Sequence, residues 1–415
     1  MVFAGFYGDD FTGSVDALLQ FRRAGLSGVL VTAPDLAVDH EDTDVVGIAG
    51  TARSLATEQM EAEILPALRR LRELDARIVQ YKACSTADSA PHVGSIGRVL
   101  ELAVGLFPGA PVPIVFAQPD AGRYTFFSHH FARDAGSVFR LDRQPTMSAH
   151  PVTPVTESDL RLHLGAQTKL ELGAVHWPAY GELPGLLADQ RAAGVVCDAV
   201  SDEDLDRLAT AILAGGGQRF VIGSGGISGA LGRQASVPRR LPPLTTTIAP
   251  AAGPTLVLNG SRSHLTRRQI DAATAAGWVV LDLFAPETAD RVRTALGTGM
   301  GVVVDSVIGG RKVPSATIED ALAAIGDSCL SRDIRLVLSG GDTSGNVLRR
   351  LGVERLRIAA RPWGNVALCH AGGSTHVEQF EVVLKGGQMG HTNLFDDIRT
   401  GRALTTDPTA NSLSV

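Results

Sequence analysis

Short apolar runs alternate with helical patterns along most of this chain, and this alternation constrains the fold more than any other feature. In the first half, apolar runs of strand length are separated by segments whose apolar residues recur at helical spacing. The runs are residues 2–7, 28–33, 44–50, 77–83 and 113–119, and the helical segments are 13–24, 57–74 and 94–106, where Pro66 can kink the second helix. This order predicts a mostly parallel sheet covered by helices on both faces.

The alternation is interrupted twice. Residues 123–162 are rich in Pro, His and Arg, too polar for a core and too long for a routine loop, so we interpret them as a functional insertion. Residues 233–254 hold five prolines and show no convincing period. After them the strand–helix alternation starts again and continues through residue 390, with a short final helix.

A length of 415 residues exceeds one ordinary core and indicates two domains. We predict a first domain at 1–235, a Pro-rich linker at 236–254 and a second domain at 255–415. The expected fold class is α/β, with two domains, each a mostly parallel sheet flanked by helices, and a cleft between them.

Composition limits the partners and the compartment. The formal net charge is −6 and no basic run occurs, which argues against a nucleic-acid partner. The uncharged stretch near 241–261 contains prolines and suits a linker, not a membrane span. No signal peptide is evident, and the four cysteines lie far apart without C-x-x-C spacing, so we expect a cytoplasmic protein with reduced thiols and no cysteine-based metal site.

Two adjacent acids stand where the first strand becomes a helix. Asp9 and Asp10 occur in GDDFTG, directly after the run at 2–7. Ligands of open α/β sheets bind at the carboxyl ends of the strands, so both acids are candidate catalytic residues. Consecutive side chains point in different directions. One acid, or Thr12, can cap the following helix, and the other can act as a general base or orient a hydroxyl.

Glycine turns follow three apolar runs in the second half. In LVLSGGDTSG, residues 336–345, two glycines open backbone donors at the start of a helix, which suits a phosphate. An ordinary Asp or Thr N-cap explains the same letters equally well. The stretches 258–266 and 382–395 are weaker: a Ser cap at Ser261 and a plain glycine turn are the alternatives. No Walker motif occurs.

Together these stretches resemble the four-carbon acid sugar kinase family. Its N-terminal pattern A/G-D-D-F-T-G-[AS]-x-D is matched by residues 8–16, and its G-G-D-T-S and late K-[SG]-G-x-[FM]-G patterns are matched by 340–344 and 385–390. The stretch GSRSHLTRRQI at 260–270 is similar to the family's G-S-C-S-x-x-T-x-x-Q segment. The matches occur in order from residue 3 to residue 395.

The resemblance implies an N-terminal domain that binds a small acid sugar and a C-terminal domain that binds ATP. It implies nucleotide contacts from Ser261, Gly340, Gly341, Asp342, Thr343, Ser344, Gly386 and Gly387. On the acid side it implies Arg123, as the carboxylate grip, together with Arg53, Lys82, Ser85 and Thr86. Asp10 or Asp9 would orient or deprotonate the attacking hydroxyl, and Mg²⁺ would be held mainly by ATP oxygens, with Asp342 acting through water.

Two stretches depart from the family's usual pattern. In the expected K-x-D-S-T-L-R-G the acid is Cys84 and the Arg is missing, and His150 stands at the acid of T-x-x-A-x-D-P. These departures resemble a branch that includes kinases of branched oxo acids. We therefore expect an ATP-dependent kinase in carbohydrate catabolism that phosphorylates a hydroxyl of a four-carbon or branched oxo acid sugar such as 3-oxo-isoapionate. The alternative is a sugar-acid sensor that kept the fold and lost transfer. The sequence leaves a homodimer open.

Overall fold

The computed structural model describes residues 2–38, 42–134, 136–188 and 191–404, except for the side chain of Asp342. The chain divides into two compact units. Unit 1 extends to Pro242 without the short segment Leu30–Thr32, and unit 2 is that segment together with the chain from Pro243. The described helices include none long and apolar enough to cross a membrane.

Unit 1 is built on a parallel sheet with the strand order β3-β1-β4-β11-β5-β10-β9. Its elements are β1 Ala4–Gly8, α1 Phe11–Arg23, β3 Val45–Ala49, η1 Ala52–Ser54, α2 Thr57–Glu73, β4 Ile78–Lys82, α3 Ile96–Leu106, β5 Val112–Val115, η2 Pro119–Ala121, β9 Leu172–Val175, η4 Trp177–Glu182, α6 Leu183–Leu186, β10 Gly194–Cys197, α7 Asp202–Ala214, β11 Arg219–Gly223 and α8 Gly225–Gln234. Strand β2, Gly28–Val31, begins in unit 1, and its Leu30 and Val31 belong to unit 2.

The predicted insertion has a small fold of its own. It forms an antiparallel sheet, order β6-β7-β8, followed by short helices. These elements are β6 Arg123–Phe126, β7 His129–Asp134, β8 Ser137–Arg140, η3 Leu141–Arg143, α4 Pro145–Ser148 and α5 Leu160–Gly165. It has a small apolar core despite its polar composition, formed by the buried residues Ala132, Leu141, Met147 and Val155.

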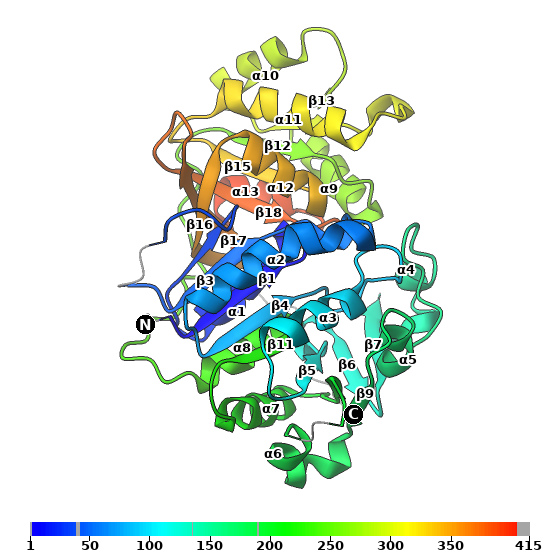
Figure 1. Ribbon diagram of the computed structural model, residues 1–415. Coiled ribbons are helices and arrows are strands. Elements are labelled where there is room, and N and C mark those ends of the chain that lie inside the picture. The colour runs from blue at the N-terminus through cyan, green and yellow to red at the C-terminus, as the bar shows by residue number, and fades with distance from the viewer. Residues whose placement is uncertain (1, 39–41, 135, 189–190, 405–415) are drawn as a thin grey trace. The chain divides into compact units, whose positions relative to one another are not determined.

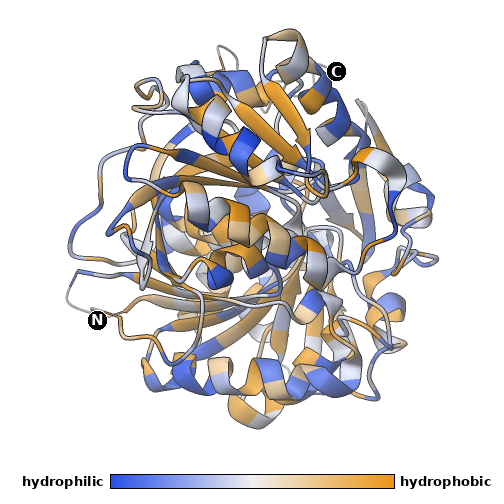
Figure 2. Ribbon diagram, turned by 90° about the horizontal axis from the view of Figure 1, so that it is seen from above, coloured by the Kyte–Doolittle hydropathy of each residue, from blue (hydrophilic) through white to orange (hydrophobic). Residues whose placement is uncertain are grey.

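Apolar periodicity explains the helices of unit 1. Helix α1 buries Val15, Leu18, Leu19 and Phe21, which recur at helical spacing, and Phe21 stacks on Phe6 of β1 with ring centroids 6.2 Å apart. Helix α1 packs against α8, α7 also packs against α8, and α2 packs against α3 (Figure 1). The strands are mainly hydrophobic while the helices carry both kinds of residue, as Figure 2 shows, which fits a sheet covered by amphipathic helices.

Unit 2 has the strand order β13-β14-β12-β15-β18-β17-β16. The first five strands are parallel, β17 and β16 are antiparallel, and β16 also pairs with Leu30 and Val31. The elements are β12 Thr255–Asn259, α9 His264–Ala275, β13 Val279–Asp282, α10 Thr288–Gly297, β14 Val302–Asp305, η5 Ile308–Gly310, α11 Ser315–Cys329, β15 Arg335–Ser339, α12 Gly341–Arg350, β16 Val353–Trp363, β17 Val366–Gly373, β18 Phe380–Lys385 and α13 Leu394–Thr400.

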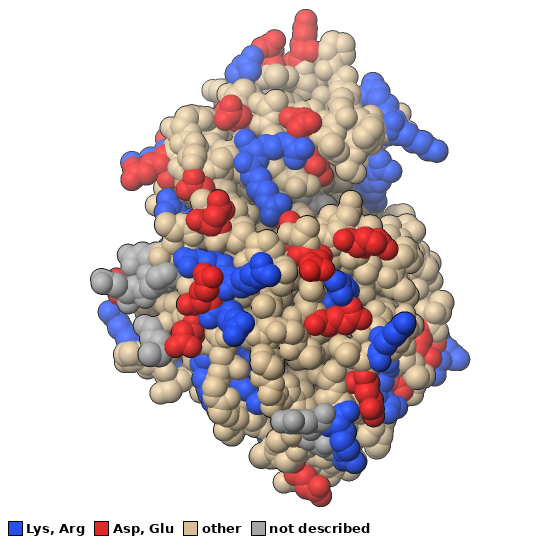
Figure 3. Space-filling view, in the orientation of Figure 1, with Lys and Arg blue, Asp and Glu red and all other residues tan. Residues whose placement is uncertain are grey.

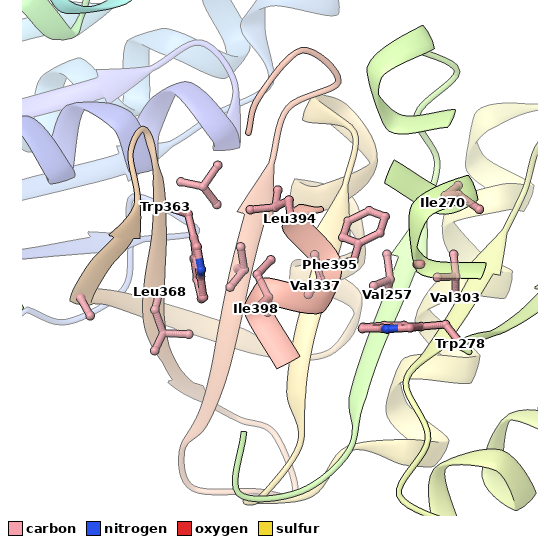
Figure 4. Packing of buried hydrophobic residues seen from close by; sticks show 14 residues of the cluster. Val257, Ile270, Trp278, Val303, Val337, Trp363, Leu368, Leu394, Phe395 and Ile398 are labelled. Atoms are coloured by element: carbon pink, nitrogen blue, oxygen red, sulfur yellow. The ribbon is translucent and has the colours of Figure 1, made fainter. Parts of the chain in front are cut away.

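The core of unit 2 is packed around large aromatic side chains. Trp278, Trp363 and Phe395 are buried among aliphatic residues of the strands and of α9 and α13 (Figure 4). Each indole N–H finds an acceptor: Trp278 Nε1 donates to Asp396 at 3.3 Å and Trp363 Nε1 to the Arg402 carbonyl at 3.0 Å. These bonds avoid the cost of a buried unpaired donor.

The structure confirms the predicted α/β class, with a mostly parallel, helix-flanked sheet in each unit. It differs from expectation in details. Helix α2 runs unbroken through Pro66, and β16, which sequence analysis missed, is eleven residues long. Arg and Glu are interspersed in β16, where only some positions are buried, so its apolar signal is weak.

Candidate active site

The predicted acid-sugar residues of unit 1 gather where its parallel strands end. Asp9 and Asp10 follow β1, Arg53 follows β3, Lys82 ends β4, and Arg123 follows β5 and η2. Ser85 and Thr86 lie just after Lys82. The carboxyl edge of a parallel sheet is where such folds bind ligands, so these segments, far apart in sequence, meet at one candidate site.

Arg53 bridges the two adjacent acids. Its Nε and Nη2 donate to Asp9 Oδ2 and Oδ1 at 3.0 and 2.7 Å, while Nη1 and Nη2 donate to Asp10 Oδ2 and Oδ1 at 2.9 and 3.0 Å. Four of the five guanidinium N–H donors are thereby used, so one remains for a ligand. Burial raises the pKa of Asp9, and Arg53 opposes that rise.

Asp10 also caps α1. Its Oδ1 accepts from the Gly13 amide at 2.7 Å, and its backbone is extended as at an N-cap. The capping role that sequence analysis gave to Asp10 or Thr12 therefore belongs to Asp10. A Cβ at Gly13 would lie 2.4 Å from Asp10 Oδ1, which explains the glycine in this turn.

Lys82 is buried and reaches a third carboxylate. Its Nζ donates to the Ala83 carbonyl at 3.1 Å and lies 3.5 Å from Asp16 Oδ2. Asp16 belongs to the sequence pattern at 8–16, but sequence analysis gave it no role. Its place on α1, six residues after Asp10, was the available signal.

Arg123 has a buried atom without a partner. Its Nη1 donates to the Ala121 carbonyl, whereas Nε has no hydrogen-bond partner among the described residues. Burial lowers the pKa of Arg123, and the nearby Cys84 thiol opposes this. Buried cationic groups are normally paired, so an anionic ligand suits this guanidinium.

A neutral histidine holds the Ser85–Thr86 loop. His130 is fully buried, and burial lowers its pKa to about 4. Its Nε2 lies 2.7 Å from the Ser85 carbonyl and its Nδ1 lies 2.9 Å from Thr125 Oγ1. Since a carbonyl only accepts, Nε2 carries the proton and Nδ1 accepts from the Thr125 hydroxyl. This histidine belongs to the insertion, and its sequence pattern left open whether it is a polar loop residue or a substrate contact.

The carboxyl edge of unit 2 is organised by a buried acid. Asp305, at the end of β14, accepts from Asn259 Nδ2 at 2.9 Å and from Arg267 Nη2 at 2.7 Å. Asn259 Oδ1 in turn accepts from the Ser261 amide at 3.0 Å. These bonds fix the turn after β12.

The turns after β12, β15 and β18 lie against one another. A Cβ at Gly387 would lie 3.0 Å from Ser261 Oγ, and Gly340 has φ +119°, a conformation that favours glycine. Ser263, not Ser261, is the N-cap of α9. Helix α12 begins at Gly341 with Gly340 as its N-cap, and no described side chain caps it. The cap by Thr343 that the sequence left open is therefore not seen. The Ser344 hydroxyl donates to the Gly340 carbonyl, and the side chain of Asp342 lies outside the described residues.

Lys385 lies beneath these turns and is fully buried. Its Nζ donates to Thr266 Oγ1 at 2.8 Å and to the Gly386 carbonyl at 3.0 Å. Burial lowers the pKa of Lys385 to about 7. Lys82 is an equally buried lysine at a strand end, but it has a carboxylate partner; for Lys385 no ion pair is seen with any described residue.

A cavity of about 430 Å³ opens beside the turns of unit 2. The residues that line it are Gly260, Arg262, Lys312, Val313, Pro314, Ser315, Ile318 and Thr343. Sequence analysis missed Arg262 and Lys312. The two basic residues that follow Gly309 and Gly310 were a usable signal for an anion-binding loop. On the face in Figure 3, charges of both signs are interspersed on the surface of each unit, so the local arrangement of cations is more informative than net charge.

Comparison with known proteins finds two domain models that match successive parts of the chain. A model described as a sugar-binding N-terminal domain matches residues 4–231, and one described as a nucleotide-binding C-terminal domain matches residues 256–395. A 3-oxo-isoapionate kinase from Paraburkholderia graminis is 34% identical over 96% of this chain and 94% of its own. A 3-oxo-tetronate kinase from Pseudomonas fluorescens is 31% identical over 94% and 95%.

Solved structures share the fold. A Salmonella typhimurium LT2 protein has a TM-score of 0.75 at 22% identity, covering 95% of this chain and 98% of its own. Haemophilus influenzae protein HI1011 has a TM-score of 0.71 at 22% identity, covering 95% and 99%.

The fold, the site and these relatives define an acid sugar kinase, a phosphotransferase with an alcohol group as acceptor. The chain belongs to the four-carbon acid sugar kinase family.

Proposed function

We propose that this kinase transfers the γ-phosphate of ATP to a hydroxyl of a branched oxo acid sugar of the 3-oxo-isoapionate type. The observation that carries the proposal is the pair Cys84 and Arg123. A thiol stands where the family pattern has an acid, and Cys84 is among the groups that raise the pKa of both Arg53 and Arg123, which puts it in the neighbourhood of these two guanidinium groups. A carboxylate at position 84 would supply counter-charge there. With a thiol, the carboxylate of the substrate fills that role.

The remaining residues of the unit 1 site hold and orient the acid sugar. Arg123 grips the carboxylate through its free N–H group, and Arg53 offers its one unused donor. Lys82, Ser85 and Thr86 provide further polar contacts for hydroxyl and oxo groups. One of the carboxylates that follow β1 orients or deprotonates the attacking hydroxyl, the role that sequence analysis predicted for Asp10 or Asp9.

Unit 2 holds the nucleotide. The backbone amides of Gly341 and Gly387, with Ser261, seat the phosphates, and the helix start at Gly341 adds partial positive charge. Gly340 and Gly386 shape the two turns, because their own amides donate to the Lys385 carbonyl and to Met389 Sδ. Thr343 borders the cavity, and the apolar residues Val313, Pro314 and Ile318 among its lining suit a nucleotide base.

Mg²⁺ is the expected companion of ATP. The described residues contain no cluster of three or more acidic, His or Cys side chains suited to a metal. Mg²⁺ would be held mainly by phosphate oxygens and water. A water-mediated role for Asp342 stays a prediction. Bound Mg²⁺ would neutralise charge on the transferred phosphoryl group.

We place the enzyme in the cytoplasm. The four cysteines are free thiols, and Cys197 and Cys369 are buried, as expected in a reducing compartment. The homodimer stays a prediction.

The test is a comparison of kcat/KM over 3-oxo-isoapionate, 3-oxo-tetronates, erythronate and threonate, measured by ADP release. The proposal expects the branched oxo acid to be the best substrate and the plain tetronates to be poor ones. Cys84→Asp should weaken binding of every acid, because its carboxylate competes for Arg53 and Arg123. A higher kcat/KM on threonate than on every oxo or branched acid would contradict the proposed substrate class.

A further inference from the structure

Two of the three carboxylates that follow β1 are already engaged. The side chains of Asp9 and Asp10 are 3% and 6% exposed, and every one of their oxygens receives an N–H from Arg53 at 2.7 to 3.0 Å. Asp10 Oδ1 also receives the Gly13 amide. Proton acceptance by either acid would weaken charge-assisted bonds that hold the turn together.

Asp16 differs from Asp9 and Asp10 both in its exposure and in its hydrogen bonds. Its side chain is 19% exposed, and its contacts are long: Oδ1 accepts from Gln20 Nε2 at 3.2 Å and from Gln118 Nε2 at 3.5 Å, and Oδ2 lies 3.5 Å from Lys82 Nζ. A substrate hydroxyl can approach this carboxylate without displacing a short bond.

The surroundings of Asp16 suit an anionic carboxylate at the substrate edge. A Cβ on Gly225 would lie 2.4 Å from Asp16 Oδ2, so the carboxylate lies directly over the backbone at the start of the ten-residue helix α8. The positive end of that helix and the Lys82 ammonium both attract negative charge. The same ammonium belongs to the predicted grip on the acid sugar, which puts Asp16 beside the ligand.

We propose that Asp16 is the catalytic carboxylate that accepts the proton of the attacking hydroxyl; this rests on the proposed function. The substrate O–H bond breaks and its proton passes to an Asp16 oxygen. The substrate oxygen bonds to the γ-phosphorus as the bond from that phosphorus to the β,γ-bridging oxygen breaks, and ADP leaves with the electron pair. Asp9, Asp10 and Arg53 then form a fixed frame around the reaction.

The decisive experiment compares Asp16→Asn, Asp9→Asn and Asp10→Asn by steady-state kinetics and thermal denaturation. Asp16→Asn should lose roughly 10²–10⁴-fold in kcat, the usual contribution of a general base, with both KM values within about threefold of wild type and a nearly unchanged Tm. Asp9→Asn and Asp10→Asn should lower Tm and lose less kcat. Asp120→Asn in η2, which removes the negative charge that pairs with Arg23, is the control and should behave as wild type.

Chemical rescue provides a second measurement, which would show no effect if Asp16 had only a structural role. Formate should restore part of kcat in Asp16→Ala, because it can take the proton in the vacated space, and it should do nothing for Asp10→Ala. An Asp16→Asn enzyme with near-wild-type kcat, or one whose KM rises while kcat is kept, overturns the proposal. So does the larger kcat loss at Asp9 or Asp10. A wild type that phosphorylates no acid sugar overturns the proposed function as well.

Discussion

Arg53 Nη2 lies 2.7 Å from Asp9 Oδ1, and the same nitrogen donates to the neighbouring Asp10 at 3.0 Å. This one contact accounts for the two adjacent acids at the end of β1. The chain places them side by side so that a single guanidinium can hold both, while Asp10 caps α1 at the same time. The turn is fixed before any ligand binds, which is how a site reduces the cost of positioning its substrate.

Replacing Arg53 should therefore damage stability and activity together. Arg53→Lys keeps the charge but cannot reach four carboxylate oxygens, so we expect a loss of about 1–3 kcal/mol in the free energy of unfolding, below the 3–5 kcal/mol typical of a buried pair that loses one partner entirely. Denaturant titration measures it. Arg70→Lys, whose ion pair with Glu73 is exposed, is the matched control and should change little. An Arg53→Lys protein as stable as wild type would contradict the claim that Arg53 stabilises the turn of Asp9 and Asp10.

Arg123 should govern affinity for the acid sugar and not for ATP. Arg123→Lys loses the planar fork that pairs with a carboxylate, so the KM for the acid should rise about tenfold or more, equivalent to about 1.4 kcal/mol. The KM for ATP should stay within about twofold. Arg133→Lys, at a guanidinium that donates to the Tyr124 hydroxyl, is the control. If the KM for the acid stays within about threefold in Arg123→Lys, this arginine is not the anchor.

Space at Gly387 should be essential for the nucleotide. The Cβ of a valine there would lie 3.0 Å from Ser261 Oγ and 3.1 Å from Ser263 Cβ, so the side chain would push against both serines and cover the turn that seats the phosphates. Calorimetry should detect no ATP binding to Gly387→Val while the acid sugar still binds. Gly297→Val, where a Cβ meets nothing within 4 Å, should bind ATP normally. Unchanged ATP affinity in a folded Gly387→Val protein would show that the turn at Gly387 does not bind the phosphates.

Lys385 should make ATP affinity depend on pH. Its amine has a pKa of about 7 in the folded protein, and bound phosphates favour the ammonium form, so ATP affinity should fall as pH rises above about 7. Without ATP, the free energy of unfolding should rise between about pH 7 and pH 10, because only the unfolded chain then binds that proton. Lys385→Met should bind ATP more weakly and without this dependence, whereas Asp342→Asn should keep it. A wild-type affinity that is flat from pH 6 to 9 would contradict the account.

Local patterns predicted most strands of the two sheets, because apolar runs and glycine turns are local signals, whereas the roles of the strand-end residues stay predictions. What they could not predict depends on contacts distant in sequence. The bridge from Arg53 to Asp9 joins residues 44 positions apart, and His130 supports Ser85 from an insertion that looked irregular. Strand β16 was missed because its burial comes from pairing with β17 and with Leu30 and Val31, not from its own composition. Asp16 stood inside a recognised pattern, yet only the structure distinguishes its partly exposed carboxylate from the two that Arg53 engages.

The central claim is that this chain phosphorylates an acid sugar with ATP, and ³¹P NMR of the reaction tests it most directly. With enzyme, MgATP and 3-oxo-isoapionate, a new phosphomonoester resonance should appear in step with ADP, and Arg123→Lys should slow it when the acid is subsaturating. Without the acid, ATP should persist. Formation of only ADP and inorganic phosphate, or no consumption of ATP with any oxo or branched acid sugar, would contradict the account.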